Sequence, residues 1–567
     1  MAKSKRPSQK SKGKERSRQR QAHDAAAATA VPPLPDDILR AIFLLNASDA
    51  DVRTRRRRKT TIACLFVCRL WYNIIMDHGQ LWGRLIVFKV SDAWKEPTVA
   101  YDAVRETRRR SKGSLLWVEV EADPLIKATK PQSTGDLSLF SEVISNHKNR
   151  IEKLDINFGD ILGLLYTWMS LAGVSSAEDP ESLESLKSLT VVLPSQSNSQ
   201  SSTHSFRKRI CTVLEPIESL APALHSFSCN ILSSTLWPTH IRDLSITPYD
   251  GVSIITLSET LFALSTMSCL ERLSINHTFQ PESSYEAFLD LPWPALPNLQ
   301  EADLKCDYGT LAHLCTGRIK PSKKMSVVVP RRLGSNKNDY TREEFILISR
   351  LFNILLSADQ KAADSSQGLE CTMTEQTFSL RTFHVQPVQG RESCTTSFSV
   401  SWSRRTAVKR KPYTIFGRIP KLRNYSHVRL SIPDKHFHRE RNLPFIIHSF
   451  SEADTLEMDK STLFWLFVGK DNRLDLQSVN TDVGQAFPLL RRILLHSMSW
   501  SWKMKKDEEQ AALQALQEFR EQHRDFVLNC VMDVIRMPGE EEGSARSLVH
   551  GAFRGWEGVG IRVDEIA

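Results

Sequence analysis

The sequence reads Leu34-Pro35-Asp36-Asp37-Ile38-Leu39-Arg40-Ala41-Ile42-Phe43 where its first helix is expected. Pro35 suits the first turn of a helix, where its missing N–H costs no hydrogen bond, and the helix dipole favours the acidic pair that follows it. The apolar spacing then places four large side chains on one stripe of that helix, namely Ile38, Leu39, Ile42 and Phe43.

A second apolar pattern runs from Cys64 to Ile75 and predicts a second helix. Its apolar stripe is wider than one neighbouring helix could cover, since it contains Cys64, Leu65, Phe66, Val67, Cys68, Trp71, Ile74 and Ile75. A segment of roughly 50 residues builds only a small core. Surplus apolar surface on such a segment indicates a site for a partner protein.

These residues resemble the F-box, a helical module that binds the small Skp-family adaptor of cullin ubiquitin ligases. The resemblance is carried, in order, by Leu34-Pro35, Val67-Cys68-Arg69-Leu70-Trp71 and Leu81-Trp82. It implies an F-box over residues 31–88, preceding a separate client-binding region. It also implies adaptor contacts at Leu34, Pro35, Ile38, Leu39, Ile42, Phe43, Leu65, Val67, Cys68, Trp71, Leu81 and Trp82. The chain departs from the family pattern between the first two helices, where Asn46 to Lys59 is longer than usual and rich in arginine.

The net charge of +10 is concentrated in two short segments. Residues 1–23 carry +8 and Arg53 to Lys59 adds six cations, so the remaining chain carries −4. A nucleic-acid-binding fold would instead spread cations over a folded face with interleaved aromatic residues. Residues 1–30 are expected to be a disordered basic tail. The basic clusters suit either solvated segments or nuclear import, with the import candidates at Lys3, Lys5, Arg6, Arg55, Arg56, Arg57, Arg58 and Lys59.

A six-residue phrase, apolar-x-x-apolar-x-apolar, recurs beyond the F-box and predicts short strands. It begins at Ile151, Leu186, Leu224, Ile241, Leu270, Leu299, Leu380 and Leu490. Such phrases resemble leucine-rich-repeat strands, whose apolar residues point inward while the intervening residues face a concave surface. The period is irregular, and short strands of an ordinary α/β domain are the alternative.

We therefore expect an α plus α/β protein, with a small all-helical F-box followed by an irregular leucine-rich-repeat-like α/β solenoid over residues 114–535. This arrangement is similar to a large class of F-box proteins in mushroom-forming fungi. Residues 536–567 are expected to form a weakly structured tail. Intervening helices are predicted at Leu139–Ser145, Ile210–Leu220, Ile254–Leu264, Glu343–Leu356 and Asp507–Phe526.

Catalytic and metal-binding motifs are not found in the sequence. The ten cysteines are scattered without a Cys-x-x-Cys pair, which favours a reducing compartment, and no cofactor is expected. His436 and His438 are expected on a surface loop. No secretory leader or membrane span is predicted.

The expected function is a non-catalytic subunit of a ubiquitin ligase, with a Skp-family adaptor, a cullin and an unidentified client protein as partners. Its expected location is the nucleus, the cytoplasm or both. The alternatives are a nuclear scaffold or nucleic-acid-associated protein that works through its basic tail, and an enzyme hidden in the α/β body.

Overall fold

The computed structural model describes part of the chain. The described residues are 34–48, 54–89, 97–121, 146–157, 183–192, 221–230, 238–247, 256–276, 279, 296–306, 310–311, 314, 319, 323–329, 367–373, 377–385, 392–401, 425–431, 450, 452–458, 462, 489–490, 492–495, 527–533 and 560–562. They belong to two compact units. The first unit contains the described residues up to 121 and residues 150–154, and the second contains the others.

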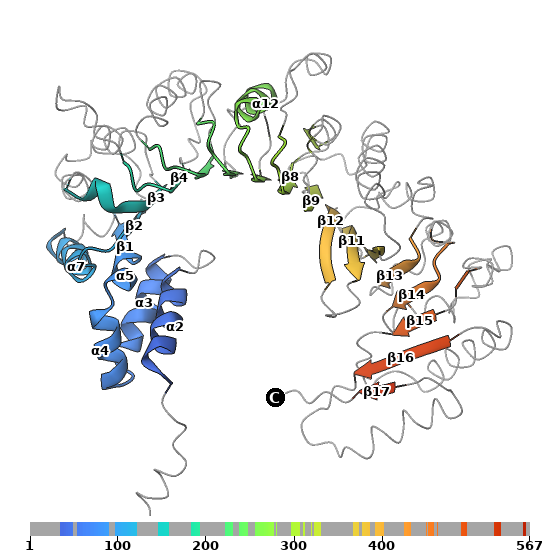
Figure 1. Cartoon of the computed structure of the whole chain (residues 1–567), viewed down its shortest axis with the longest axis horizontal. Helices are drawn as coiled ribbons and strands as arrows, with labels where there is room; N and C mark the ends of the chain where they lie inside the picture. The colour runs from blue at the N-terminus through green and yellow to red at the C-terminus, as the bar shows by residue number, and fades with distance from the viewer. Residues whose placement is uncertain are drawn as a thin grey trace, which may run out of the picture. The chain divides into compact units, whose positions relative to one another are not determined.

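The first unit begins with four helices, followed by a small α/β layer (Figure 1). The helices are α2 (Asp36–Ser48), α3 (Thr54–Cys64), α4 (Arg69–Asp77) and α5 (Gly79–Gly83). The strands β1 (Ile86–Lys89) and β2 (Leu116–Glu121) pair in parallel and are connected through α7 (Pro97–Arg110). Eight residues form the buried core of the helices: Leu39, Phe43, Ala47, Ile74, Ile75, Leu81, Trp82 and Leu85.

The predicted second helix is interrupted in the structure. α3 ends at Cys64, and α4 begins only at Arg69. Between them a tight turn forms, in which Phe66 N donates to Ala63 O over 3.1 Å, and Cys68 is extended. The prediction of one helix from Cys64 to Ile75 was therefore wrong. Apolar spacing did not reveal the break, because Cys64, Leu65 and Trp71 all pack against the same core.

The arginine-rich segment is helical, although the sequence was read as a long connection there. Arginine and lysine are good helix formers, and tertiary contacts hold this helix in place. The buried Arg57 donates from Nη1 to Ala47 O over 2.6 Å and from Nη2 to Thr54 Oγ1. Arg57 thus fixes the start of α3 against the end of α2.

Two glycines allow α5 to lie close to the chain that links α7 to β2. A Cβ atom on Gly79 would lie 2.9 Å from Ser111 O, and one on Gly83 would lie 2.4 Å from Leu115 O. Real Cβ atoms essentially never approach a backbone atom this closely. The close packing of this turn therefore depends on glycine.

Gly83→Ala is expected to lower the free energy of unfolding of the first unit by about 1–3 kcal/mol, because the added methyl group forces the two backbones apart. Urea unfolding followed by circular dichroism measures the loss. Gly113→Ala is the matched control, since a Cβ there meets nothing within 4 Å in the described part of the unit. Equal stability of the two variants would contradict this packing.

Fourteen strands of the second unit form one mixed, mostly parallel sheet (Figure 1). They are β4 (Ser188–Val192), β5 (Ser226–Cys229), β6 (Asp243–Ile246), β7 (Arg272–Asn276), β8 (Glu301–Lys305), β9 (Lys324–Val329), β10 (Gln367–Met373), β11 (Thr377–Val385), β12 (Glu392–Ser401), β13 (His427–Ser431), β14 (Thr455–Met458), β15 (Arg492–Leu495), β16 (Val527–Asp533) and β17 (Gly560–Arg562). A further strand, β3 (Ile151–Asn157), begins in the first unit after the 3-10 turn η1 (Lys148–Arg150).

The order of the strands reverses in the middle of the sheet. β4 to β9 follow one another in parallel, but β9 then pairs with β12 instead of β10. β12 pairs with β11, and β11 pairs with β10, both antiparallel. β10 then pairs with β13, and the strands from there to β17 follow one another in parallel. Among these strands, β11 alone runs antiparallel to its neighbours.

Most of the predicted strand phrases occupy strands and turn their apolar residues inward. In the first six phrases all three apolar positions are buried, from Ile151 to Leu304. A turn precedes five of these strands, as where Leu186 N donates to Leu183 O over 3.0 Å. A second hydrogen-bonding pattern recurs where the strands begin. For example, Glu271 N and Arg272 N both donate to Arg242 O, just before the preceding strand, over 2.8 Å. The shared geometry explains why the phrase is detectable in the sequence.

The phrase at Leu380 has a different origin. It lies in the antiparallel strand β11, where the register shifts between Thr382 and Phe383. The extra residue of this bulge lies in β12, between Cys394 and Thr396, so β11 itself gains none. Leu380 and Phe383 are both buried, but their strand is antiparallel to both neighbours, unlike a repeat strand. The reading of this phrase as a repeat strand is therefore corrected. The phrase at Leu490 matches β15, which is parallel to both neighbours.

One predicted helix is described, α12 (Leu257–Thr266), which corresponds to the expected Ile254–Leu264. A capping box begins it: Glu259 N donates to Thr256 Oγ1, and Thr256 N donates to Glu259 Oε2 over 3.1 Å. The strand β17 lies within the expected weakly structured tail. Other predictions lie outside the described residues, namely the tail 1–30, the remaining helices and the loop with His436 and His438.

Candidate functional site

The helices of the first unit expose large apolar side chains although their core is filled. On α2, Leu39 and Phe43 face the core, while the adjacent side of the helix exposes Ile38 by 47%, Ile42 by 45% and Leu45 by 70%. Further exposed side chains lie before α2, on α3 and α4 and in the turn between them, where Phe66 reaches 83%. We call this set the apolar helical surface: Leu34, Ile38, Ile42, Leu45, Ile62, Phe66, Val67 and Leu70.

The structure divides the twelve predicted adaptor contacts into three groups. Six are exposed, and these are Leu34, Pro35, Ile38, Ile42, Val67 and Cys68. Leu65 and Trp71 are partly buried against the core. Four belong to the core itself, and these are Leu39, Phe43, Leu81 and Trp82. The expectation that these four bury against a partner is corrected, because their side chains are already covered within the unit.

Four members of the apolar helical surface were not among the predicted adaptor contacts, namely Leu45, Ile62, Phe66 and Leu70. Leu45 could have been found, because it lies three residues after Ile42 on the same helix face. Ile62 could not, because its helix, α3, was read as part of a connection.

Trp82 holds three helices of the first unit together. Its side chain is 3% exposed, and its Nε1–H donates to Ile75 O at the end of α4 over 2.8 Å. The guanidinium of Arg110, from α7, lies 4.6 Å from the centre of its ring. Phe43 and Trp71 add an edge-to-face contact with ring centres 5.1 Å apart. The core residues therefore fix the helices that carry the exposed apolar side chains.

The basic run on α3 is divided between the core and the surface. Arg55, Arg56 and Lys59 are exposed, whereas Arg57 is buried. Arg58 is half-buried and donates to Ala103 O on α7 over 3.4 Å. The run therefore presents three exposed cations, and its role as an import signal stays a prediction. The other import candidates, Lys3, Lys5 and Arg6, lie outside the described residues.

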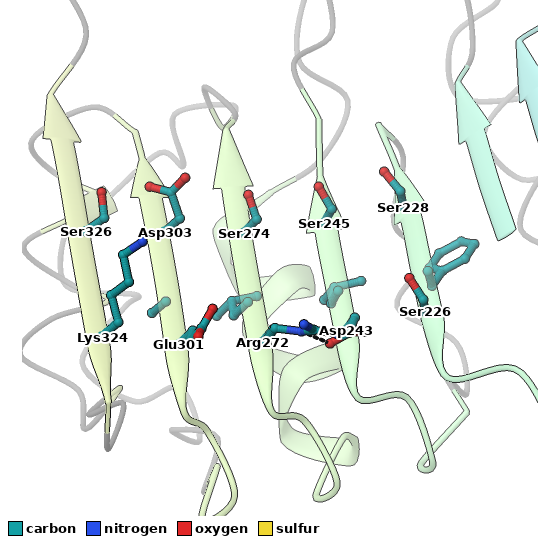
Figure 2. Close-up of a pocket in the computed structure, with 14 residues that line it drawn as sticks. Ser226, Ser228, Asp243, Ser245, Arg272, Ser274, Glu301, Asp303, Lys324 and Ser326 are labelled. Carbon is teal, nitrogen blue, oxygen red and sulfur yellow. Dashed lines mark hydrogen bonds and ion pairs between the residues drawn. The ribbon is translucent and has the colours of Figure 1, made fainter. Parts of the chain in front are cut away.

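The second unit has a shallow hollow of about 310 Å³ over one face of β5 to β9 (Figure 2). Two rows of side chains, aligned by the strand register, line it. The first row is Ser226, Asp243, Arg272, Glu301 and Lys324, and the second is Ser228, Ser245, Ser274, Asp303 and Ser326. We call these ten residues the strand face.

Small hydroxyl side chains and paired charges give the strand face its character. In the first row, Arg272 donates from Nη2 to Asp243 Oδ2 over 2.6 Å, and this hydrogen bond raises the pKa of Arg272. In the second row, four serines leave space above the sheet and can each donate and accept hydrogen bonds. Such a face suits a polar polypeptide surface. Among the described residues, no group of His, Cys, Asp and Glu could hold a metal ion.

The sequence pointed to the strand face only in general terms. Its residues are the intervening positions of the strand phrases, which were expected to face outward, but no individual residue was named. The alignment of four serines into one row depends on the register between strands that lie 17 to 29 residues apart in the chain.

No protein-family model matches this chain, and no curated protein matches it either. Within the described residues, no helix is long and apolar enough to cross a membrane. The function must therefore be inferred from the chain's own residues.

Proposed function

We propose that this protein is a non-catalytic substrate-recognition subunit of an SCF-type ubiquitin ligase. The apolar helical surface carries the proposal. A filled core beneath four exposed apolar side chains on one side of α2 and its N-terminal approach is what a protein-binding module presents. The partner would be a Skp-family adaptor, which connects the chain to a cullin.

The order of the sequence motifs supports an F-box in particular. Leu34 and Pro35 precede α2, Val67 and Cys68 form the turn before α4, and Leu81 and Trp82 lie in α5. The first two motifs supply exposed side chains, while the third belongs to the core. The motifs therefore divide into a contact surface and the support that holds it.

We place the client on the second unit, as in a leucine-rich-repeat-like solenoid. The parallel strands β4 to β9, with buried apolar positions alternating with outward, mostly polar ones, support this arrangement. The chain would catalyse no bond change itself. It would raise the effective concentration of client lysines near the ubiquitin thioester carried by the enzyme on the cullin.

The triple variant Ile38→Asp, Ile42→Asp, Val67→Asp tests the proposal. These side chains are exposed, so the first unit of the variant is expected to fold normally. Its affinity for the adaptor is expected to fall at least tenfold, because the interface would bury the new carboxylates without partners. Co-purification of the full chain with a Skp-family adaptor and a cullin measures the loss.

The matched control is Ser245→Arg, Ser274→Arg, which fills the hollow of the strand face without touching the first unit. This control is expected to keep the adaptor and to lose client proteins that accumulate under proteasome inhibition. If the triple variant retained the adaptor at the wild-type level, the proposal would be wrong.

A further inference from the structure

The outer side of α3 joins cations to apolar side chains along one helix face. Arg55, Lys59 and Ile62 are spaced by four and three residues, and all three are exposed. Phe66 follows in the turn after the helix. The apolar helical surface thus continues directly into a cationic stretch.

The opposite side of α3 fixes this stretch in place. Thr54, Arg57 and Thr61 are buried there. The Nδ2 group of Asn46, on α2, donates to Thr61 Oγ1 over 3.3 Å, which adds to the Arg57 contact with Ala47 O. The exposed cations therefore stand on a helix anchored to α2 and are not part of a loose loop.

The positive charge of α3 is not balanced by acidic residues of the same helix, although Glu119 Oε2 accepts a hydrogen bond from Thr54 N at its start over 3.3 Å. α3 contains five cations and no acidic residue. On the neighbouring α7, Glu106 is already bound by Arg109 and Arg110 at 2.7 Å each, which lowers its pKa to about 2. The pKa of Arg58 is lowered by burial and by the charge of Arg110. An anionic partner surface would complement the exposed cations of α3.

We infer that Arg55 and Lys59 form a cationic border of the apolar helical surface, and that the protein covering this surface carries an acidic border opposite it. The inference rests on the proposed function, whose partner it describes further. A protein fits better than nucleic acid, because a phosphate backbone would leave the adjacent Ile62 and Phe66 uncovered. Charge at the border of an interface acts mainly on the association rate.

The test is the double reversal Arg55→Glu, Lys59→Glu in the full chain, with a purified Skp-family adaptor as the probe. At low salt the association rate is expected to fall about tenfold, since steering by charge raises association rates by this order or more. The dissociation rate is expected to change much less. At 1 M salt, where the screening length is about 3 Å, the two association rates are expected to converge.

The control Lys305→Glu, Lys323→Glu makes the same change in net charge on exposed residues of the second unit outside the strand face, and it is expected to leave association unchanged. The conservative pair Arg55→Lys, Lys59→Arg is expected to associate at the wild-type rate. If the reversal matches wild type at every salt concentration, the inference fails while the proposed function stands. If wild type does not bind the adaptor at all, both fail.

Duplex DNA serves as a second probe. Under the inference, the reversal leaves DNA binding by the full chain essentially as it is in wild type. If it abolishes salt-dependent DNA binding while adaptor association stays at the wild-type rate, the border binds nucleic acid and the inference is overturned.

Discussion

Trp82→Ala is expected to lower the free energy of unfolding of the first unit by about 3–5 kcal/mol. Truncating the indole leaves a cavity between α4, α5 and α7, since the side chain is 3% exposed. It also removes the hydrogen bond to Ile75 O and the stacking of the Arg110 guanidinium. Most of a small unit's stability would be lost in this one change.

Hydrogen exchange of the amides in α4 and α5 measures this loss locally, which separates it from the unfolding of the second unit. Trp82→Phe keeps a ring and loses the hydrogen bond to Ile75 O, which still accepts from His78 N. A smaller loss of about 0.5–1.5 kcal/mol is therefore expected. Phe66→Ala is the surface control and should be near neutral, because that ring is 83% exposed. If Trp82→Ala lowered the free energy of unfolding less than Trp82→Phe does, packing of the indole would not be what stabilises this core.

The sequence predicted which residues of the first unit are apolar and helical, but not which way they face. Ile38, Leu39, Ile42 and Phe43 were placed on one stripe, whereas the structure buries Leu39 and Phe43 and exposes the two isoleucines. A helix with apolar residues on two adjacent sides has no single best inward direction. The direction is set by packing against α4 and α5, which local periodicity does not contain.

The helix α3 shows a second limit of local patterns. Its run of cations has no apolar period, so nothing in the sequence marks it as packed. Its position depends on Arg57 reaching Ala47 O and on Arg58 reaching Ala103 O, which lie 10 and 45 residues away in the chain. A prediction that places every charged residue on the surface cannot identify buried arginines of this kind.

In the second unit, local patterns located strands and missed their order. The strand phrase is local, because its turn and its three apolar positions lie within about ten residues, as from Leu183 to Val191. The reversed insertion of β10 to β12 depends on pairings such as Phe398 with Val327, which are far apart in the chain. The coarse α/β architecture was therefore predictable from the sequence, while the topology was not.

Glu457→Ala is expected to lower the free energy of unfolding of the second unit by about 3 kcal/mol, because breaking a buried ion pair leaves its partner uncompensated. The Glu457 side chain is 2% exposed and accepts hydrogen bonds from His427 Nε2 over 2.9 Å and from Arg429 Nε. All three lie on the adjacent strands β13 and β14 (Figure 1). We place the effect at the lower end of the known range, because Arg429 can still reach Glu370 at 3.9 Å.

Urea unfolding of the Glu457 variants, followed by hydrogen exchange in β13 and β14, measures the effect. Glu457→Gln keeps the shape and one acceptor oxygen, so it should fall between wild type and Glu457→Ala. Arg381→Ala is the matched control at the outer end of the same row, where the ion pair with Glu370 is 3.6 Å long and Arg381 is 45% exposed. Exposed pairs contribute only about 0–1 kcal/mol. If Arg381→Ala cost as much as Glu457→Ala, the stability would come from the row of charges as a whole, and the burial of Glu457 would not be the cause.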